Sequence, residues 1–230
     1  MAKDNQNRWK RPLSRVGLVT TLVAATSCSS PSGPTPGSGT GDNSSGVNCA
    51  VFSDSASSAY TLTFATGQRV YVSRTFEHYL AANGGVGVYA IDFDVPMRTP
   101  VHAARGGMVV AVEQRFSDDD HANFHENWVM VRHADGTVGR YIHLARNGAL
   151  VAVGDEVRQG QRLGLSGNSG ASNGPHLHFD VQTCGPNLPP GYNTMPCGMT
   201  VPVSFRNTAP HSCGLTPRQS YTAAAFTPDP

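Results

Sequence analysis

From residue 60 onward, the chain consists of short segments in which apolar and polar residues alternate, and glycine-rich turns separate them. The segments YTLTF and RVYVS flank Gly67, and WVMVR and TVGRYI flank the pair Asp135-Gly136. Alternation with many β-branched and aromatic residues is typical of strands, and Asp-Gly is a strong hairpin signal. The pattern therefore predicts a mainly β fold, a single domain of antiparallel sheets that line a groove.

The 25 glycines and 16 prolines support this interpretation, because these residues favour turns over long helices. Residues 60–64 and 69–73 are expected to pair as one hairpin, and residues 127–144 are expected to form a second. The segment VPVSFRN, at residues 201–207, is expected to be the last strand. The sequence shows no internal repeat and no second domain.

The stretch SNGPHLHFDV, residues 172–181, ends in a strand pattern that carries two histidines. Side chains two residues apart in a strand point to the same face, so His176 and His178 are expected side by side, with Leu177 and Phe179 facing a core. One imidazole can bind a divalent metal while its neighbour acts on a substrate, or both can bind metal. The alternative to such a site is that the two histidines simply lie at the surface beside a turn. It stays open because two ligands alone do not make a metal site.

The first 28 residues have the layout of a secretory signal. Basic residues precede the apolar run VGLVTTLVAATSC, which is too short for a comfortable membrane span. The small residues before Cys28 resemble a bacterial lipoprotein cleavage site, where the cysteine becomes the lipidated first residue. Ordinary cleavage near Ala25, with Cys28 incidental, is the alternative.

This layout divides the chain into three parts. We expect a lipoprotein-like signal peptide at residues 1–28, a Ser/Gly/Pro-rich linker at 29–48, and a folded domain at 49–230 that ends in a Pro/Cys-rich segment, 183–230. The signal holds five basic residues and one acidic residue, so 12 basic and 15 acidic residues remain after it. The mature chain is then mildly acidic, which gives no indication of nucleic-acid binding.

Five cysteines are present, so four remain if Cys28 carries a lipid. An even number in an oxidising compartment predicts two disulfides. Four cysteines allow three pairings. We favour Cys184–Cys197, which closes a short Pro-rich loop, together with Cys49–Cys213, which ties the two ends of the domain. A zinc site built from cysteines is the alternative, but no CxxC pair is present.

The segment FSDDDHANFHENW, residues 116–128, is unusually rich in potential metal ligands. It holds three Asp, two His and one Glu, a composition that suits a metal site. However, it lies between two predicted strands and is dense in polar residues. A solvated loop, or a rim over a groove, is therefore the preferred interpretation.

Further polar residues accompany the predicted strands. Asp92 lies between Ile91 and Phe93 in YAIDFDV, and burial of a carboxylate without a partner is costly. His143 ends the strand segment RYIHL, and His78 lies upstream in TFEH. These residues join the two histidines of HLH as candidates for one polar site.

The segments TFEH, YAIDFDVPMRTPVHAARGGMV, NWVMVRHADGTVGRYIHL, VAVGDEVRQGQRLGLSGNSG and GPHLHFDV occur in this order. Together they resemble the lysostaphin-type (LytM-type) zinc metallopeptidases, which cut peptide cross-links of bacterial peptidoglycan. The resemblance extends over about residues 60–182. It implies a duplicated-hybrid-motif-like β fold with a substrate groove.

The resemblance also implies one catalytic Zn²⁺ per domain, with His78, Asp92 and His178 as protein ligands and a fourth position left for water. It implies that His143 and His176 lie near the substrate. There they would orient or deprotonate the water and stabilise the tetrahedral oxyanion.

One position departs from the family pattern. Many members place the first histidine four residues before the aspartate, and here that residue is Val88. His78 lies 14 residues before Asp92, as in a subgroup with a motif like FSH, a variable loop and then YAIDF. We expect His78 to be the ligand. The histidines that could replace it are His102, His121 and His125. Asp180, two residues after His178, is a candidate to support a ligand histidine.

The implied function is zinc-dependent hydrolysis of peptide cross-links in peptidoglycan. The expected location is the cell envelope, with the Cys28 lipid in a membrane, preferably the outer membrane facing the periplasm, or secretion. Pentaglycine bridges and direct cross-links from D-Ala to a diamino acid are both open as substrates. A catalytically inactive wall-binding protein, or an activator of a peptidoglycan amidase, is the alternative. We expect a monomer that binds no nucleic acid, and not a lipoyl-type carrier, because no lysine follows residue 10.

Overall fold

The computed structural model describes residues 48–75, 87–183 and 200–228. Two short 3-10 helices, η1 (Cys49–Val51) and η2 (Ser55–Ser57), precede the strands. The strands are β1 (Arg69–Thr75), β2 (Ile91–Asp94), β3 (Pro100–His102), β4 (Gly107–Glu113), β5 (Trp128–Arg132), β6 (Thr137–Ile142), β7 (Leu144–Ala149), β8 (Glu156–Val157), β9 (Arg162–Ser166), β10 (His176–Thr183) and β11 (Gln219–Thr222).

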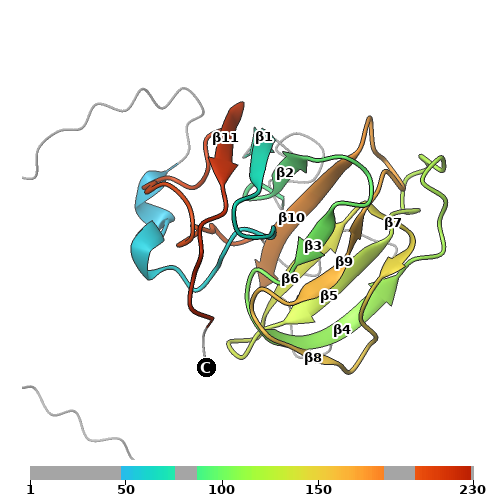
Figure 1. The fold of residues 1–230 in the computed structure, drawn as a ribbon, viewed down its shortest axis with the longest axis horizontal. Coiled ribbons are helices and arrows are strands. Elements are labelled where there is room, and N and C mark those ends of the chain that lie inside the picture. The colour runs from blue at the N-terminus through green and yellow to red at the C-terminus, as the bar shows by residue number, and fades with distance from the viewer. Residues whose placement is uncertain (1–47, 76–86, 184–199, 229–230) are drawn as a thin grey trace, which may run out of the picture. The chain divides into compact units, whose positions relative to one another are not determined.

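These strands form two sheets, and every strand pairing within them is antiparallel. The larger sheet has the order β11-β1-β2-β10-β6-β5-β4-β8, and the smaller has the order β3-β9-β7 (Figure 1). The prediction of a mainly β domain with antiparallel strands is therefore confirmed. Strands β2 and β10 are neighbours although 81 residues lie between Asp94 and His176, and this pairing positions the site.

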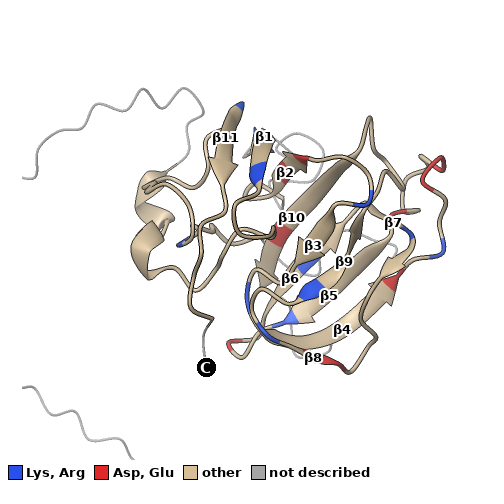
Figure 2. Ribbon diagram, in the orientation of Figure 1, with Lys and Arg blue, Asp and Glu red and all other residues tan. Residues whose placement is uncertain are grey.

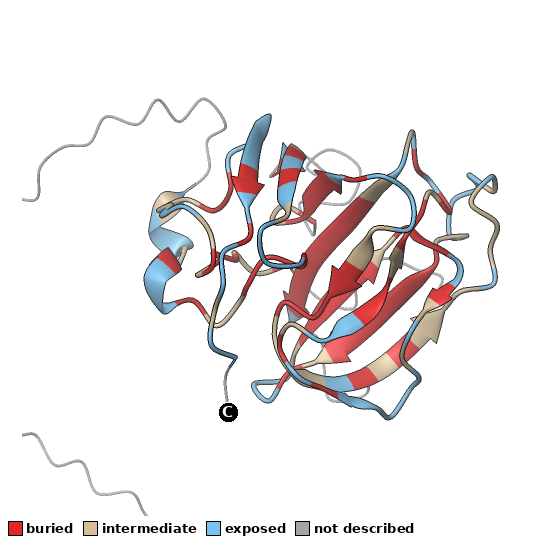
Figure 3. Ribbon diagram, in the orientation of Figure 1, coloured by how far each residue is buried: buried red, intermediate tan, exposed pale blue. Residues whose placement is uncertain are grey.

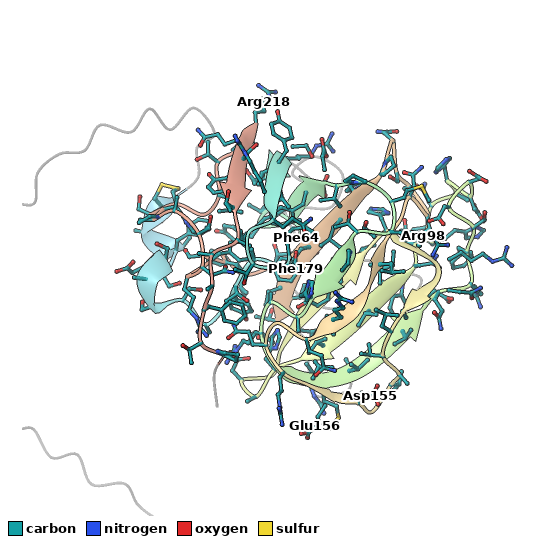
Figure 4. All side chains as sticks on the ribbon, viewed as in Figure 1. Phe64, Arg98, Asp155, Glu156, Phe179 and Arg218 are labelled. Carbon is teal, nitrogen blue, oxygen red and sulfur yellow. A yellow bond between two sulfur atoms is a disulfide. The ribbon has the colours of Figure 1, made fainter. Side chains whose placement is uncertain are left out.

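The two faces of the large sheet have different roles. On one face lie Leu177, Phe179 and Phe93, which are fully buried in the main hydrophobic core. Residues of the small sheet, such as Leu163, belong to the same core. Strands of both sheets have long buried stretches (Figure 3). Aromatic rings meet edge to face in this core, with 5.2 Å between the ring centroids of Phe64 and Phe93. Phe64 and Phe179, which are labelled in Figure 4, belong to this core. The opposite face carries the histidines and carboxylates, as the alternation predicts.

Two of the expected strands are corrected by the structure. Residues 60–64 are not a strand, and β1 pairs with β2 and β11 instead. The 60–64 segment still buries Leu62 and exchanges backbone hydrogen bonds with residues 102–104, but it does so without a continuous ladder. Residues 201–207 are not the last strand either, because β11 fills that place in the sheet. The hairpin of β5 and β6 is confirmed, with Gly136 at φ 84° in its turn.

Charged residues are distributed over strands and loops among the described residues, without one large area of a single sign (Figure 2). The expected signal peptide at residues 1–28, with Cys28, and all of the linker except Asn48 lie outside the described residues. Among the described residues, no helix has the length and apolar character to cross a membrane.

A disulfide joins Cys49 to Cys213. This is one of the two pairings that the sequence favours, and it links the start of the domain to its C-terminal part. The other expected pair, Cys184 with Cys197, lies outside the described residues.

Replacing both Cys49 and Cys213 with serine is expected to lower the free energy of unfolding by about 2–4 kcal/mol. The bond joins residues 164 positions apart, so its loss frees a long loop in the unfolded chain. Urea unfolding of the double variant and the parent chain, both without reductant, measures the difference. An unchanged unfolding midpoint would contradict this role for the bond.

Candidate active site

Asp92 and the HLH histidines come together across two neighbouring strands. In the ladder between β2 and β10, Asp92 lies opposite His178 and Asp94 lies opposite His176. Directly opposite residues share a face, so these side chains meet on the face away from the core. Asp92 Oδ1 lies 3.2 Å from His178 Nδ1 and 3.6 Å from His176 Nε2. The expected side-by-side arrangement of the two imidazoles is confirmed by this register.

The two ring nitrogens of His178 face different carboxylates. Nδ1 faces Asp92, and Nε2 lies 3.0 Å from Asp180 Oδ2. Burial lowers the pKa of His178, but hydrogen bonds that it donates to Asp180 and Asp92 outweigh burial and raise the pKa to about 9. A buried ring between two carboxylates is thus suited to carry positive charge, or to face a cation on its Nδ1 side.

Asp180 is itself held by an arginine from the next strand. In the β10–β6 ladder Asp180 lies opposite Arg140. Arg140 Nε donates to Asp180 Oδ1 at 2.8 Å, and Arg140 Nη2 donates to Asp180 Oδ2 at 2.6 Å. Burial alone would raise the pKa of Asp180, but the charges of Arg140 and His178 hold it well below its usual value. Asp180 is therefore an ionised carboxylate that accepts from His178 Nε2–H.

His143 reaches the site through a backbone turn. In the ladder Ile142 lies opposite His178, so Ile142 is on the face of the site and Tyr141 is on the core face. Strict alternation would place His143 on the core face with Tyr141. The backbone of His143 instead adopts a left-handed conformation, with φ 63°, directly after β6 ends. The ring then lies with its centroid 4.5 Å from that of His176. Strain of this kind is concentrated at functional sites.

The protonation of His143 follows from its surroundings. Its Nδ1 lies 2.7 Å from the carbonyl oxygen of Ser169, so this nitrogen carries the proton and donates it. Burial and the neighbouring His176 and His178 lower the pKa of His143 to about 3. The ring is therefore neutral at ordinary pH, and its Nε2 has a free lone pair.

His176 has the same arrangement. Its Nδ1 lies 2.8 Å from the carbonyl oxygen of Gly174 and 3.2 Å from Ser172 Oγ. The carbonyl can only accept, so Nδ1 carries a proton, and Nε2 is the nitrogen that faces Asp92. The imidazoles of His143 and His176 thus both border the space beside Asp92.

This space is a groove of about 790 Å³. It contains Asp92, His143, His176 and His178, and every one of these was singled out by the sequence. The residues that line it are Ser73, Arg74, Asp92, Asp94, Val95, Pro96, His143, Ala171, Asn173, Gly174, Pro175, His176 and His178. A groove lined by convergent polar groups is the usual form of an active site.

The polar loop at residues 116–128 supports one wall of the groove. Asp118 accepts a hydrogen bond from the backbone N–H of Asn168, and Glu126 accepts one from that of Ala171. The backbone N–H of Gly170 donates to the carbonyl of Asp120. The loop therefore fixes the segment that leads into HLH, which agrees with the expected rim and not with a metal site.

His178 and Asp92 fit a zinc ion. Two ligands on one tetrahedral zinc lie roughly 3.3 Å apart, given bond lengths of about 2.0–2.2 Å, and the 3.2 Å between Asp92 Oδ1 and His178 Nδ1 agrees with this. The hydrogen bond from His178 Nε2 to Asp180 leaves the Nδ1 lone pair available. Within the described ranges, no group of three or more His, Cys, Asp or Glu side chains forms a complete metal site. His78, the expected third ligand, lies outside the described residues.

The histidines that could have replaced His78 do not line the groove. His102 is buried at the end of β3 in the small sheet. His125 lies 2.8 Å from Asp120 through its Nδ1 and stacks on Phe116. His121 is exposed in the polar loop. His78 therefore stays the preferred ligand.

Several residues of the site were not found from the sequence. Arg140 has no motif that marks it, and only the ladder shows that it faces Asp180. Ser169 and Gly174 act through their backbone carbonyls, which the sequence does not distinguish. Asp180 was anticipated from its position two residues after His178, and the structure places it against the ring nitrogen of His178.

Comparison with known proteins finds relatives that are named as peptidoglycan endopeptidases. ShyA, a peptidoglycan DD-endopeptidase of Vibrio cholerae serotype O1, is 38% identical over 90 residues, which are 39% of this chain and 19% of ShyA. Mpg, a DD-carboxypeptidase/endopeptidase of Neisseria meningitidis serogroup B, is 33% identical over 100 residues, 44% of this chain and 21% of Mpg. The chain thus spans about a fifth of the length of these curated relatives.

Among solved structures, the catalytic domain of the antimicrobial peptidase lysostaphin from Staphylococcus simulans matches with 29% identity and a TM-score of 0.40, and the match covers 58% of this chain and 86% of that domain. The model of peptidase family M23 matches residues 87–190, which contain Asp92, His143 and both histidines of HLH. Residues 87–190, a little under half of the chain, therefore resemble the domain of peptidase family M23.

Proposed function

We propose that this protein is a zinc-dependent endopeptidase that hydrolyses peptide cross-links of bacterial peptidoglycan. The observation that carries the proposal is the convergence of Asp92 Oδ1 and His178 Nδ1 beside the imidazoles of His143 and His176 in one groove. The family M23 domain and relatives named as peptidoglycan DD-endopeptidases support the same activity.

Asp92 and His178 would hold the zinc ion, with His78 as the third protein ligand. Two nitrogens and one carboxylate oxygen are a ligand set of catalytic zinc sites. When bound, zinc would polarise the scissile carbonyl and lower the pKa of a water molecule. Asp180 and Arg140 keep the ring of His178 in the orientation and tautomer that this requires.

His143 and His176 would carry out the proton transfers. Both donate their Nδ1–H to a backbone carbonyl, so both present Nε2 as a base. One of them takes a proton from the attacking water. A protonated imidazole then donates a hydrogen bond to the developing oxyanion or gives its proton to the leaving amine. The assignment of base and acid between the two is left to measurement.

A substrate in the wall requires a location outside the cytoplasm. The secretory layout of residues 1–28 supports the cell envelope or secretion, and Cys28 supports a lipid anchor in a membrane. The Ser/Gly/Pro-rich linker would give an anchored domain the reach to meet the wall.

Incubation of the full chain with purified peptidoglycan tests the proposal. Peptidoglycan with direct D-Ala to diamino acid cross-links and peptidoglycan with pentaglycine bridges would be digested in parallel, with and without a zinc chelator. Mass spectrometry is expected to show new peptide ends that disappear with chelator and return when zinc is restored. Binding to the wall without new ends, in folded protein, would favour the wall-binding or amidase-activator function instead.

A further inference from the structure

The groove holds one cationic side chain that no other feature of the site explains. Arg74, on β1, is exposed and is the one Lys or Arg among the described residues that line the groove. It lies opposite Asp92 in the β1–β2 ladder, directly after a register shift between Val72 and Arg74. Arg74, Asp92 and His178 therefore occupy one row across three strands, on the face of the site.

No hydrogen bond or ion pair links the side chain of Arg74 to another described residue, whereas other arginines, such as Arg140, are engaged in ion pairs. A guanidinium without a partner, held beside a site, is suited to bind a planar carboxylate from outside the protein. From this position we infer that Arg74 is a specificity residue that binds a carboxylate of the substrate next to the scissile bond. This inference rests on the proposed function.

The two candidate cross-links differ in whether a carboxylate lies near the scissile bond. In a direct cross-link from D-Ala to a diamino acid, the carbon that bears the scissile nitrogen can also carry a free carboxylate. In a glycine bridge no charged group lies so close to the scissile bond. Neighbouring strands are about 4.8 Å apart. If the scissile amide lies over Asp92 on β2, the side chain of Arg74 on β1 can therefore reach a carboxylate two bonds from the scissile nitrogen. Arg74 would therefore favour cross-links whose leaving amine bears a carboxylate.

Two synthetic peptides test this inference. In both, D-Ala is joined to a D-amino acid amine, and they differ only in whether the carbon beside the scissile nitrogen bears a carboxylate or a carboxamide. The zinc-loaded full chain would be compared with its Arg74→Gln variant. Arg69→Gln is the matched control, because Arg69 is an exposed arginine of the same strand that does not line the groove.

For Arg74→Gln we expect kcat/KM to fall about 10-fold on the carboxylate peptide and to stay unchanged on the carboxamide peptide. Arg69→Gln should change neither value. Equal losses on both peptides, or no loss on either, would overturn the inference.

Calorimetric binding of the carboxylate and carboxamide peptides to chelator-treated protein separates this inference from the proposed function. If the parent chain cuts neither peptide, the proposed function fails. The inference then stands only if the parent chain binds the carboxylate peptide more tightly and Arg74→Gln removes that preference. Equal binding by the two proteins would refute it.

Discussion

Replacing Asp180 with asparagine is expected to weaken zinc binding by about 10- to 100-fold and to lower the free energy of unfolding by about 3–5 kcal/mol. Zinc binding weakens because the carboxylate of Asp180 holds the proton of His178 on Nε2, and the amide of asparagine would not. The Nδ1 atom of His178 is then less available to the metal. The free energy of unfolding falls because the buried guanidinium of Arg140 loses its carboxylate partner. Competition with a chromophoric chelator and urea unfolding of metal-free protein measure the two effects separately.

A double variant separates the two causes. In Arg140→Met/Asp180→Asn the buried charge is gone, so most of the lost stability should return. The support for His178 is still absent, so zinc binding should stay weak. If zinc affinity recovers together with stability, Asp180 only stabilises the fold and does not position the ligand ring.

Alanine at His143 or at His176 is expected to reduce kcat/KM for wall peptides by about 10²- to 10⁴-fold. The bound zinc should stay at the level of the parent chain, because neither histidine is an expected ligand. Hydrolysis of a soluble cross-link peptide gives the rate, and elemental analysis gives the zinc content. Loss of zinc in either variant would instead make that residue a ligand and remove it from the proton transfers.

The pH profile of the two variants assigns their roles. A general base must be unprotonated, so its loss removes the acidic limb from the dependence of kcat/KM on pH, while loss of the other histidine leaves that limb in place. His121→Ala is the control, because this histidine is exposed in the polar loop and lies outside the groove. It should retain the activity and the profile of the parent chain.

Alternation in the sequence was sufficient to place the central part of the site. The pattern LHFDV separates His176 and His178 from Leu177 and Phe179, and the structure keeps this separation because the apolar pair fills the core. Asp92 could be predicted as a buried polar residue in an apolar strand. The Cys49–Cys213 bond was among the favoured pairings because it closes the ends of the domain.

Other parts depend on contacts that local patterns do not contain. His143 breaks the alternation of its own strand through a left-handed backbone, and only the surrounding hydrogen bonds select that conformation. The 60–64 segment has a strand pattern, but β11, more than 140 residues later in the chain, takes the place beside β1. Long-range competition of this kind, like the pairing of Arg140 with Asp180, is decided by tertiary packing.

Strand β10 contributes one face to the core and the other to the site, so the formation of the site is coupled to folding. Sliding β10 by a single residue against β2 would turn Leu177 and Phe179 out to water and push both histidines into the apolar interior. The free energy gained by burying Leu177 and Phe179 therefore selects the register in which Asp92 lies opposite His178. A chain that has reached its folded state therefore has Asp92 and His178 aligned. The amides of β2 and β10 should exchange with solvent only when the whole domain opens.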